Sequence, residues 1–257
     1  MSATGLVATT WQEVRKRPGT VVFSFWYLFI VVIFEYFSLS HLGPGFSSWV
    51  SRLTTTGVIP GLHGSLAVKL ALVYLTFVLI VFPFSVAGLG GGVAAALCGK
   101  DTLNSLFSFF RHAVSNFWTS LGLIVSALVA SVIVYLAIVV LLNLGSLDLV
   151  LAVVARLVAL AVAVYWFALL FYWAGAVFAG AEPSLVGLRH ALQWVIHNPW
   201  LALRVTVLVL VLMMVAAVIF AVVSQLPLFG SIISMIGSGI VLTLVATFAM
   251  LLYLNQS

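Results

Sequence analysis

Side chains able to act as a general acid or base are few in this chain and lie far apart. The carboxylates are Glu13, Glu35, Asp101, Asp148 and Glu182. No HExxH or GxSxG motif occurs, so neither a metal-activated nor a serine hydrolase site is indicated. An acid and a base would be hard to bring together from these positions. The sequence therefore predicts no enzymatic activity, no catalytic residue and no cofactor.

Glu35 and Arg156 each interrupt a long apolar segment. A charge at the centre of a membrane-spanning helix costs about 2.5–3.5 kcal/mol on insertion scales, and such residues usually face protein or water. An ion pair between them would lower this cost and could line a path for a ligand or proton. Alternatively they form a structural clamp, or their side chains reach the membrane surface separately. We predict both as candidate binding residues.

The histidines give little support for a metal site. His41 and His63 bracket one polar segment and could join Glu35 in binding an ion, but their spacing is unlike that of zinc sites. We therefore expect no bound metal. The remaining histidines, which we expect to contact lipid headgroups or a partner protein, are His112, His190 and His197.

Small residues at intervals of four mark two further segments. Gly88 and Gly92 form one such pair, and Gly175 and Gly180 each pair with a neighbouring alanine. This spacing lets helix backbones approach closely within a membrane. A phosphate-binding loop is the rival interpretation, but neither segment contains the GxxxxGK or GxGxxG motif. We predict that these four glycines pack helices together, within one chain or between chains.

The composition identifies the environment of these residues. Hydrophobic residues make up 65% of the 257 positions and charged residues only 6%, whereas soluble domains are about 25% charged. This composition predicts an all-α integral membrane protein with several spans. The net charge of +5 comes from too few cations to form a phosphate-binding stripe, so we expect no nucleic-acid partner.

Six apolar segments are long enough to cross the hydrocarbon, which takes about 20 residues. They cover residues 20–39, 70–89, 121–142, 149–179, 201–223 and 232–254. The first is too long for a signal-peptide core, so we interpret it as a retained anchor. Short polar breaks at 143–146 and 225–228 predict hairpins, whereas a longer loop over about 40–65 joins the first two spans.

The distribution of Lys and Arg predicts the orientation. One side would hold Arg15, Lys16, Arg17, Lys100, Arg111 and Arg189. The other side has Arg52, with Lys69 at the outer boundary of the second span. Because cytoplasmic loops carry the excess of positive charge, we expect both termini to be cytoplasmic, in the cytoplasmic membrane. Arg204, near the cytoplasmic end of the fifth span, is a candidate for binding lipid phosphates.

A unit of one amphipathic stretch followed by two spans occurs three times, with repeats at 1–92, 93–180 and 181–257. The joints are Arg17-Pro18-Gly19, Asn116-Phe117-Trp118 and Asn198-Pro199-Trp200. The amphipathic stretches lie near 7–14, 103–117 and 185–196, and we expect them to lie flat in the inner interface. The alternative is coincidence, because Trp and Asn are common where any interfacial helix enters a span.

This pattern resembles the YciC-like proteins and the membrane domain of some glycerophosphodiester phosphodiesterases. The matching features are the second and third joints and the small residues Ala174-Gly175-Ala176. The resemblance implies six spans as three units, but no common chemistry. The chain is also similar in length and span number to ABC-2 permeases, whose cytoplasmic segments engage an ATPase. The helices at 103–117 and 185–196 could do so here.

The sequence leaves two candidate functions. The first is a non-enzymatic accessory or envelope-organising subunit that contacts membrane lipids and partner proteins, in a membrane-protein complex or a homo-oligomer. The alternative is a transporter or ABC-type permease subunit in which Glu35 and Arg156 lie near the translocation path.

Overall fold

The computed structural model describes residues 3–56, 64–99, 107–145, 149–223, 225 and 230–255. Within these ranges the regular structure is entirely helical. Six helical segments are long and apolar enough to cross a membrane, at Thr20–Gly43, Gly64–Leu97, Phe117–Asn143, Val150–Phe178, Pro199–Val223 and Ile233–Leu254. The predicted class of a multi-pass, all-α membrane protein is confirmed.

Short helices alternate with pairs of long ones. In chain order the helices are α1 (Ala3–Lys16), α2 (Thr20–Thr56), α3 (Gly64–Thr76), the π-helical segment η1 (Phe77–Val81), α4 (Phe82–Leu97), α5 (Ser108–Ser115), α6 (Phe117–Gly145), α7 (Leu149–Phe178), α8 (Ser184–His197), α9 (Pro199–Val223) and α10 (Gly230–Leu254). The predicted amphipathic stretches correspond to α1, α5 and α8. Residues 100–106, which include the predicted start of the second stretch, lie outside the described residues.

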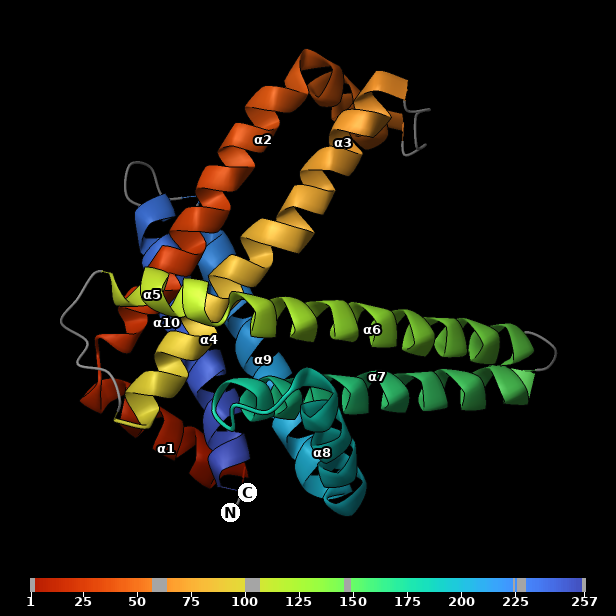
Figure 1. Ribbon diagram of the computed structural model, residues 1–257. Helices are drawn as coiled ribbons and strands as arrows, with labels where there is room; N and C mark the ends of the chain where they lie inside the picture. Colours follow the sequence, from red (N-terminus) through yellow and green to blue (C-terminus); the bar gives the residue numbers. More distant parts are fainter. Residues whose placement is uncertain are drawn as a thin grey trace.

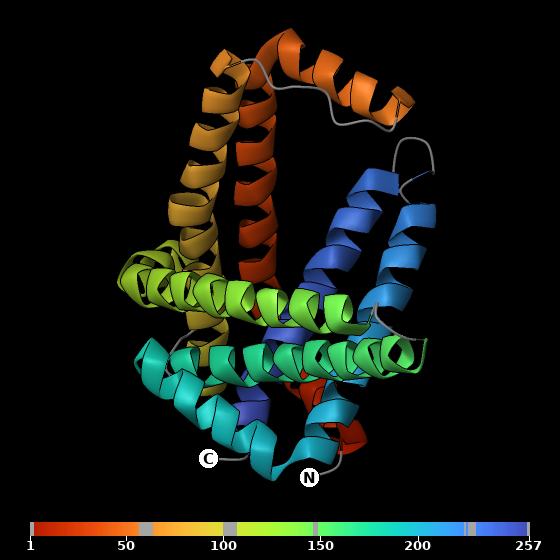
Figure 2. The same ribbon diagram turned by 90° about the vertical axis from the view of Figure 1, so that its right-hand side faces the viewer.

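The loop predicted over 40–65 is wrong for its first part. The helix that begins at Thr20 continues to Thr56, with a kink at Gly43 where φ is +68°. Glycine adopts this left-handed conformation without steric cost, so the helix changes direction there instead of ending. Figure 2 shows the segment after the kink turning sideways at the upper end of α2.

The second span is longer than the predicted 70–89. It runs as α3, η1 and α4 over Gly64–Leu97. Pro83 lacks an N–H for the helical ladder, and just before it the chain takes the wider π register, with the Phe82 N–H bonded to the Phe77 carbonyl. The glycines that follow do not end the helix, because aromatic rings from α2, α5 and α7 pack against them.

Each short helix packs on the end of a long one. α5 packs on α4, α8 packs on α7, and α1 packs on α10. The same pairing therefore occurs three times, and in the first case the short helix packs on the last span. Figures 1 and 2 show both ends of the chain at the same, lower end of the molecule. We call α1, α4, α5, α8 and the adjoining ends of the long helices the base.

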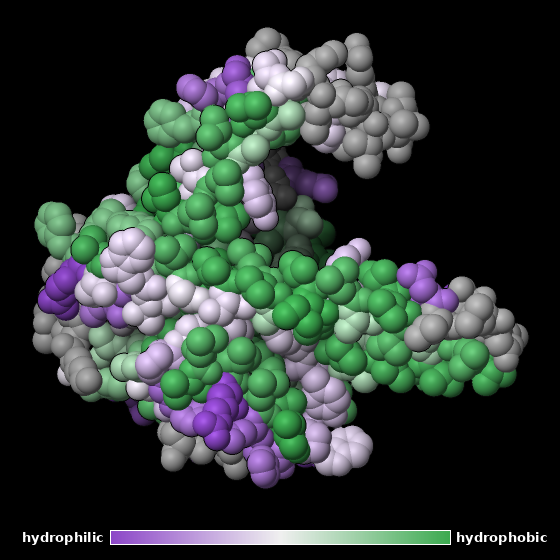
Figure 3. Space-filling model, turned by 45° about the vertical axis from the view of Figure 1, so that its right-hand side comes forward, coloured by the Kyte–Doolittle hydropathy of each residue, from purple (hydrophilic) through white to green (hydrophobic). Residues whose placement is uncertain are grey.

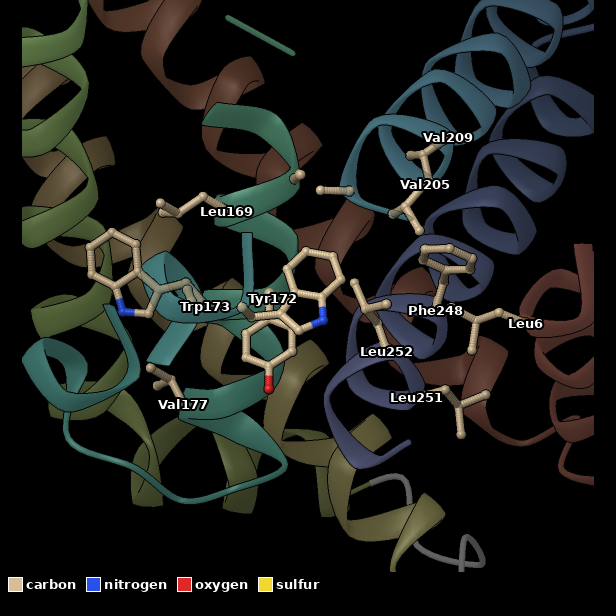
Figure 4. Close-up of a cluster of buried hydrophobic side chains, with 14 of the residues drawn as sticks. Leu6, Leu169, Tyr172, Trp173, Val177, Val205, Val209, Phe248, Leu251 and Leu252 are labelled. Atoms are coloured by element: carbon tan, nitrogen blue, oxygen red, sulfur yellow. The ribbon is translucent and has the colours of Figure 1, made fainter. Parts of the chain in front are cut away.

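The buried side chains concentrate in the base. One cluster joins α1, α6, α7, α8, α9 and α10 (Figure 4). It includes the fully buried Trp173, whose Nε1 donates a 2.7 Å hydrogen bond to the Ser184 carbonyl. A second cluster joins α2, α4, α5 and α10 around Phe23 and Phe109. The long helices are therefore fixed to each other at one end.

Beyond the base the helices form three arms, α2–α3, α6–α7 and α9–α10. Figures 1 and 2 show that α6 and α7 run across the direction of the other two arms. Figure 3 shows apolar side chains over this hairpin and an open hollow between it and the α2–α3 arm. The six candidate spans therefore do not share one direction.

Candidate functional site

The structure does not bring Glu35 and Arg156 together. Glu35 lies on the α2–α3 arm and Arg156 lies on the α6–α7 arm. Both side chains are exposed, and neither makes an ion pair within the described part of the chain. The clamp between them is therefore not formed. Arg204 is exposed near the base end of α9, where its predicted contact with lipid phosphates stays a prediction.

The predicted packing glycines lie at helix contacts. A Cβ atom on Gly175 would overlap the backbone oxygen of Ala249 on α10, and one on Gly180 would overlap the Tyr253 hydroxyl. Gly88 likewise lies under the ring of Phe109. A side chain at these positions would push helices apart, so the glycines set how closely α7 approaches α10 and α5 approaches α4.

Two of the three joints are built alike around an asparagine. The backbone N–H of Asn116 donates to the His112 carbonyl at 3.0 Å, and its side-chain Nδ2 donates to the same oxygen at 3.1 Å. Asn198 does the same to the Trp194 carbonyl, at 2.9 and 3.3 Å. In each case the asparagine's own carbonyl accepts an N–H four residues later at 2.9 Å. Each asparagine thus ends one helix and begins the next.

Arg17 occupies the equivalent place in the first joint. Its guanidinium donates to the Ala96 carbonyl at the end of α4 and lies 3.7 Å from the Glu13 carboxylate. A cation beside the carbonyl end of a helix is favourable, because the partial charge there is negative. The positions predicted as joints are confirmed as helix boundaries, and the first also ties α1 to α4.

A polar cluster in the base involves Glu182, whose role the sequence did not predict. Its carboxylate accepts a 2.9 Å hydrogen bond from the Tyr253 hydroxyl and lies 2.9 Å from Nδ1 of His190. The Glu182 side chain is 15% exposed. The cluster connects the turn after α7 with α8 and with the end of α10. The only sequence signal was His190, in a histidine-containing triplet that also occurs at 111–113.

These residues line a polar hollow of about 460 Å³. Tyr172 forms one wall, stacked on Trp194 with ring centroids 4.8 Å apart, and Tyr253 meets Tyr172 edge-on. Gln193, His197 and Asn198 complete the lining. The carboxylate of Glu182 is held by two donors, so the arrangement suits a fixed contact surface better than a free catalytic base.

Side chains of the types that bind metal ions do not cluster among the residues that the structure describes. No group of three His, Cys, Asp or Glu side chains lies together there in a way that could hold an ion. His63, which we considered as a metal ligand together with His41 and Glu35, lies outside the described residues.

No protein family, no curated protein and no solved structure matches this chain.

Proposed function

We propose that the protein is a non-enzymatic accessory or envelope-organising subunit of the cytoplasmic membrane, which acts by contacting lipids and partner membrane proteins. The observation that carries the proposal is the contrast between the packed base and the uncovered arms. The long helices are joined at one end, and beyond it their apolar surfaces face outwards.

The α6–α7 arm is the clearest case. Ile133, Tyr135 and Leu136 are 64%, 65% and 55% exposed, and both helices carry large exposed apolar side chains along their length. An apolar surface of this extent is covered in a working protein, by lipid tails or by the helices of a partner. The arm therefore supports a function in contacts within the membrane.

The short helices of the base support the same proposal. Each packs one side against a long helix and leaves apolar side chains uncovered, among them Trp11, Val114 and Leu185. Uncovered apolar residues on a helix with a polar opposite face are typical of helices that lie in the headgroup region. In this proposal the base lies at the cytoplasmic interface, with both termini in the cytoplasm.

The transport alternative needs Glu35 and Arg156 to face one path. They lie on separate arms in the described chain, and no contact links them. We therefore favour the accessory role.

The test is purification of the full chain from its own membranes in a mild detergent, followed by native mass spectrometry. We expect no catalytic turnover and a defined lipid or protein subunit retained on the chain. A chain recovered alone, with the same behaviour in every lipid, would overturn the proposal.

A further inference from the structure

We propose that a groove at the outer end of the α2–α3 arm binds one anionic phospholipid, with its phosphate at His41 and Lys69 and an acyl chain against Leu72 and Val73. The inference rests on the proposed membrane function and names a lipid class and a site for it.

The groove lies between α2 and α3 at the end of the arm far from the base. Its volume is about 380 Å³, and most of its lining is apolar. Phe34 forms its inner part, with its ring centroid 5.6 Å from that of Phe77 in η1. The groove is open to the outside of the protein.

The order of side chains along both helices matches the order of groups in a phospholipid. On α2, the lining runs inwards from His41 through Ser38 to Phe34, which is seven residues and about 10 Å of helix. On α3, it runs inwards from Lys69 through Leu72 and Val73 to Thr76. Each helix therefore presents a basic group towards the outer end and apolar groups below it, with Ser38 and Thr76 as polar members of the lining.

The charge of the groove favours an anionic headgroup. His41 and Lys69 are both exposed and have no ion-pair partner among the residues that the structure describes. No carboxylate lines the groove. A second groove, of about 330 Å³ between α1, α9 and α10, has no charged side chain in its lining and offers nothing to hold a phosphate.

A soluble phosphate would use only the outer part of this groove. The apolar lining below Lys69 would stay uncovered, whereas an acyl chain would fill it. Lys69 lies five residues inside the outer end of its span, which begins at Gly64, and its long side chain can extend outwards to the depth of a phospholipid phosphate. A lipid of the leaflet opposite the termini is therefore the occupant that accounts for both parts of the groove.

The experiment uses the full chain in detergent, titrated with phosphatidylglycerol or phosphatidylcholine and measured by native mass spectrometry. We expect one phosphatidylglycerol to bind more tightly than phosphatidylcholine, and Lys69→Gln to weaken it about five-fold, as expected for one cation near a lipid phosphate. Val73→Trp keeps both basic groups and fills the groove, so it is also expected to weaken binding. Glycerol phosphate should not compete at the same concentrations.

The control is Arg189→Gln, which removes the same charge from an exposed position on α8 in the base. It should leave the binding of the single phosphatidylglycerol unchanged. An equal loss in this control, or unchanged binding in both groove variants, would overturn the site while leaving the proposed function intact. Equal binding of both lipids by every form, with no retained partner, would overturn the site and the proposed function together.

Discussion

Tyr253 donates a 2.9 Å hydrogen bond to the carboxylate of Glu182, and this bond ties the end of the last span to the turn after α7. The Glu182 carboxylate is mostly buried, so loss of the Tyr253 hydroxyl would leave its negative charge with one hydrogen-bond donor fewer. The bond therefore helps to hold α7 and α10 together in the base, where the first and last helices also meet.

Replacement of this donor should weaken the base. We expect Tyr253→Phe to lower the free energy of unfolding by about 1–2 kcal/mol, because a hydrogen bond to a charged group is lost while the ring is kept. The matched control is Tyr135→Phe, since Tyr135 is exposed on α6. Thermal unfolding in detergent, followed by circular dichroism, measures both. Equal stability of the two variants would contradict a structural role for the bond.

The asparagine joints should be sensitive to the side-chain amide. Asn198→Ala removes the Nδ2 bond to the Trp194 carbonyl but keeps the backbone bonds, so we expect a loss of about 0.5–1.5 kcal/mol. Asn198→Asp should be no better, because a carboxylate cannot donate. Gln193→Ala, at an exposed position of α8, serves as the control in the same unfolding assay. A stable aspartate variant would show that the amide donor is not needed.

Replacement by alanine should change the stability of the fold in opposite directions at two glycines. A methyl group on Gly175 would overlap the backbone of α10, so we expect Gly175→Ala to destabilise the fold by about 1–3 kcal/mol. Gly122 in α6 has open space at the Cβ position, and Gly122→Ala should stabilise the helix by about 0.5–1 kcal/mol. The two shifts in unfolding temperature test whether close approach, and not helix propensity, decides the effect at Gly175.

The orientation can be tested at the single cysteine. Cys98 is exposed at the end of α4, in the base. A membrane-impermeant maleimide should label it in inverted vesicles and not in intact cells, because we place the base on the cytoplasmic side. The control is Cys98→Ser combined with Ser40→Cys, near the outer end of the first span, which should label with the reverse pattern. Labelling of Cys98 from outside would reverse the proposed topology.

The spans and joints could be predicted because their signals are local. A run of about 20 apolar residues needs no tertiary information to be recognised. The polar residue before each span marks the helix boundary in the same way, as at Asn116 and Asn198. The kink at Gly43 and the π register before Pro83 were not predicted. Glycine and proline usually end a helix, but here the helix continues through both.

The direction of the arms could not be predicted from the sequence. α6 and α7 are apolar on all sides, so no stripe specifies which face turns inwards or along which axis the pair lies. The contact between Glu182 and Tyr253 spans 71 residues and depends on the packing of the base. In contrast, Gly175 and Gly180 could be identified as packing residues, because their spacing is itself the signal.

In the proposed function, the uncovered arms contact lipids or partner proteins within the membrane. The most direct test places a photo-crosslinking phenylalanine derivative at Tyr135 on α6, in intact membranes, with Trp173 in the buried core as the control position. We predict discrete lipid or protein adducts from Tyr135 after illumination and none from Trp173. If Tyr135 yields no more adduct than Trp173 in a correctly folded protein, the arm has no partner and the claim is wrong.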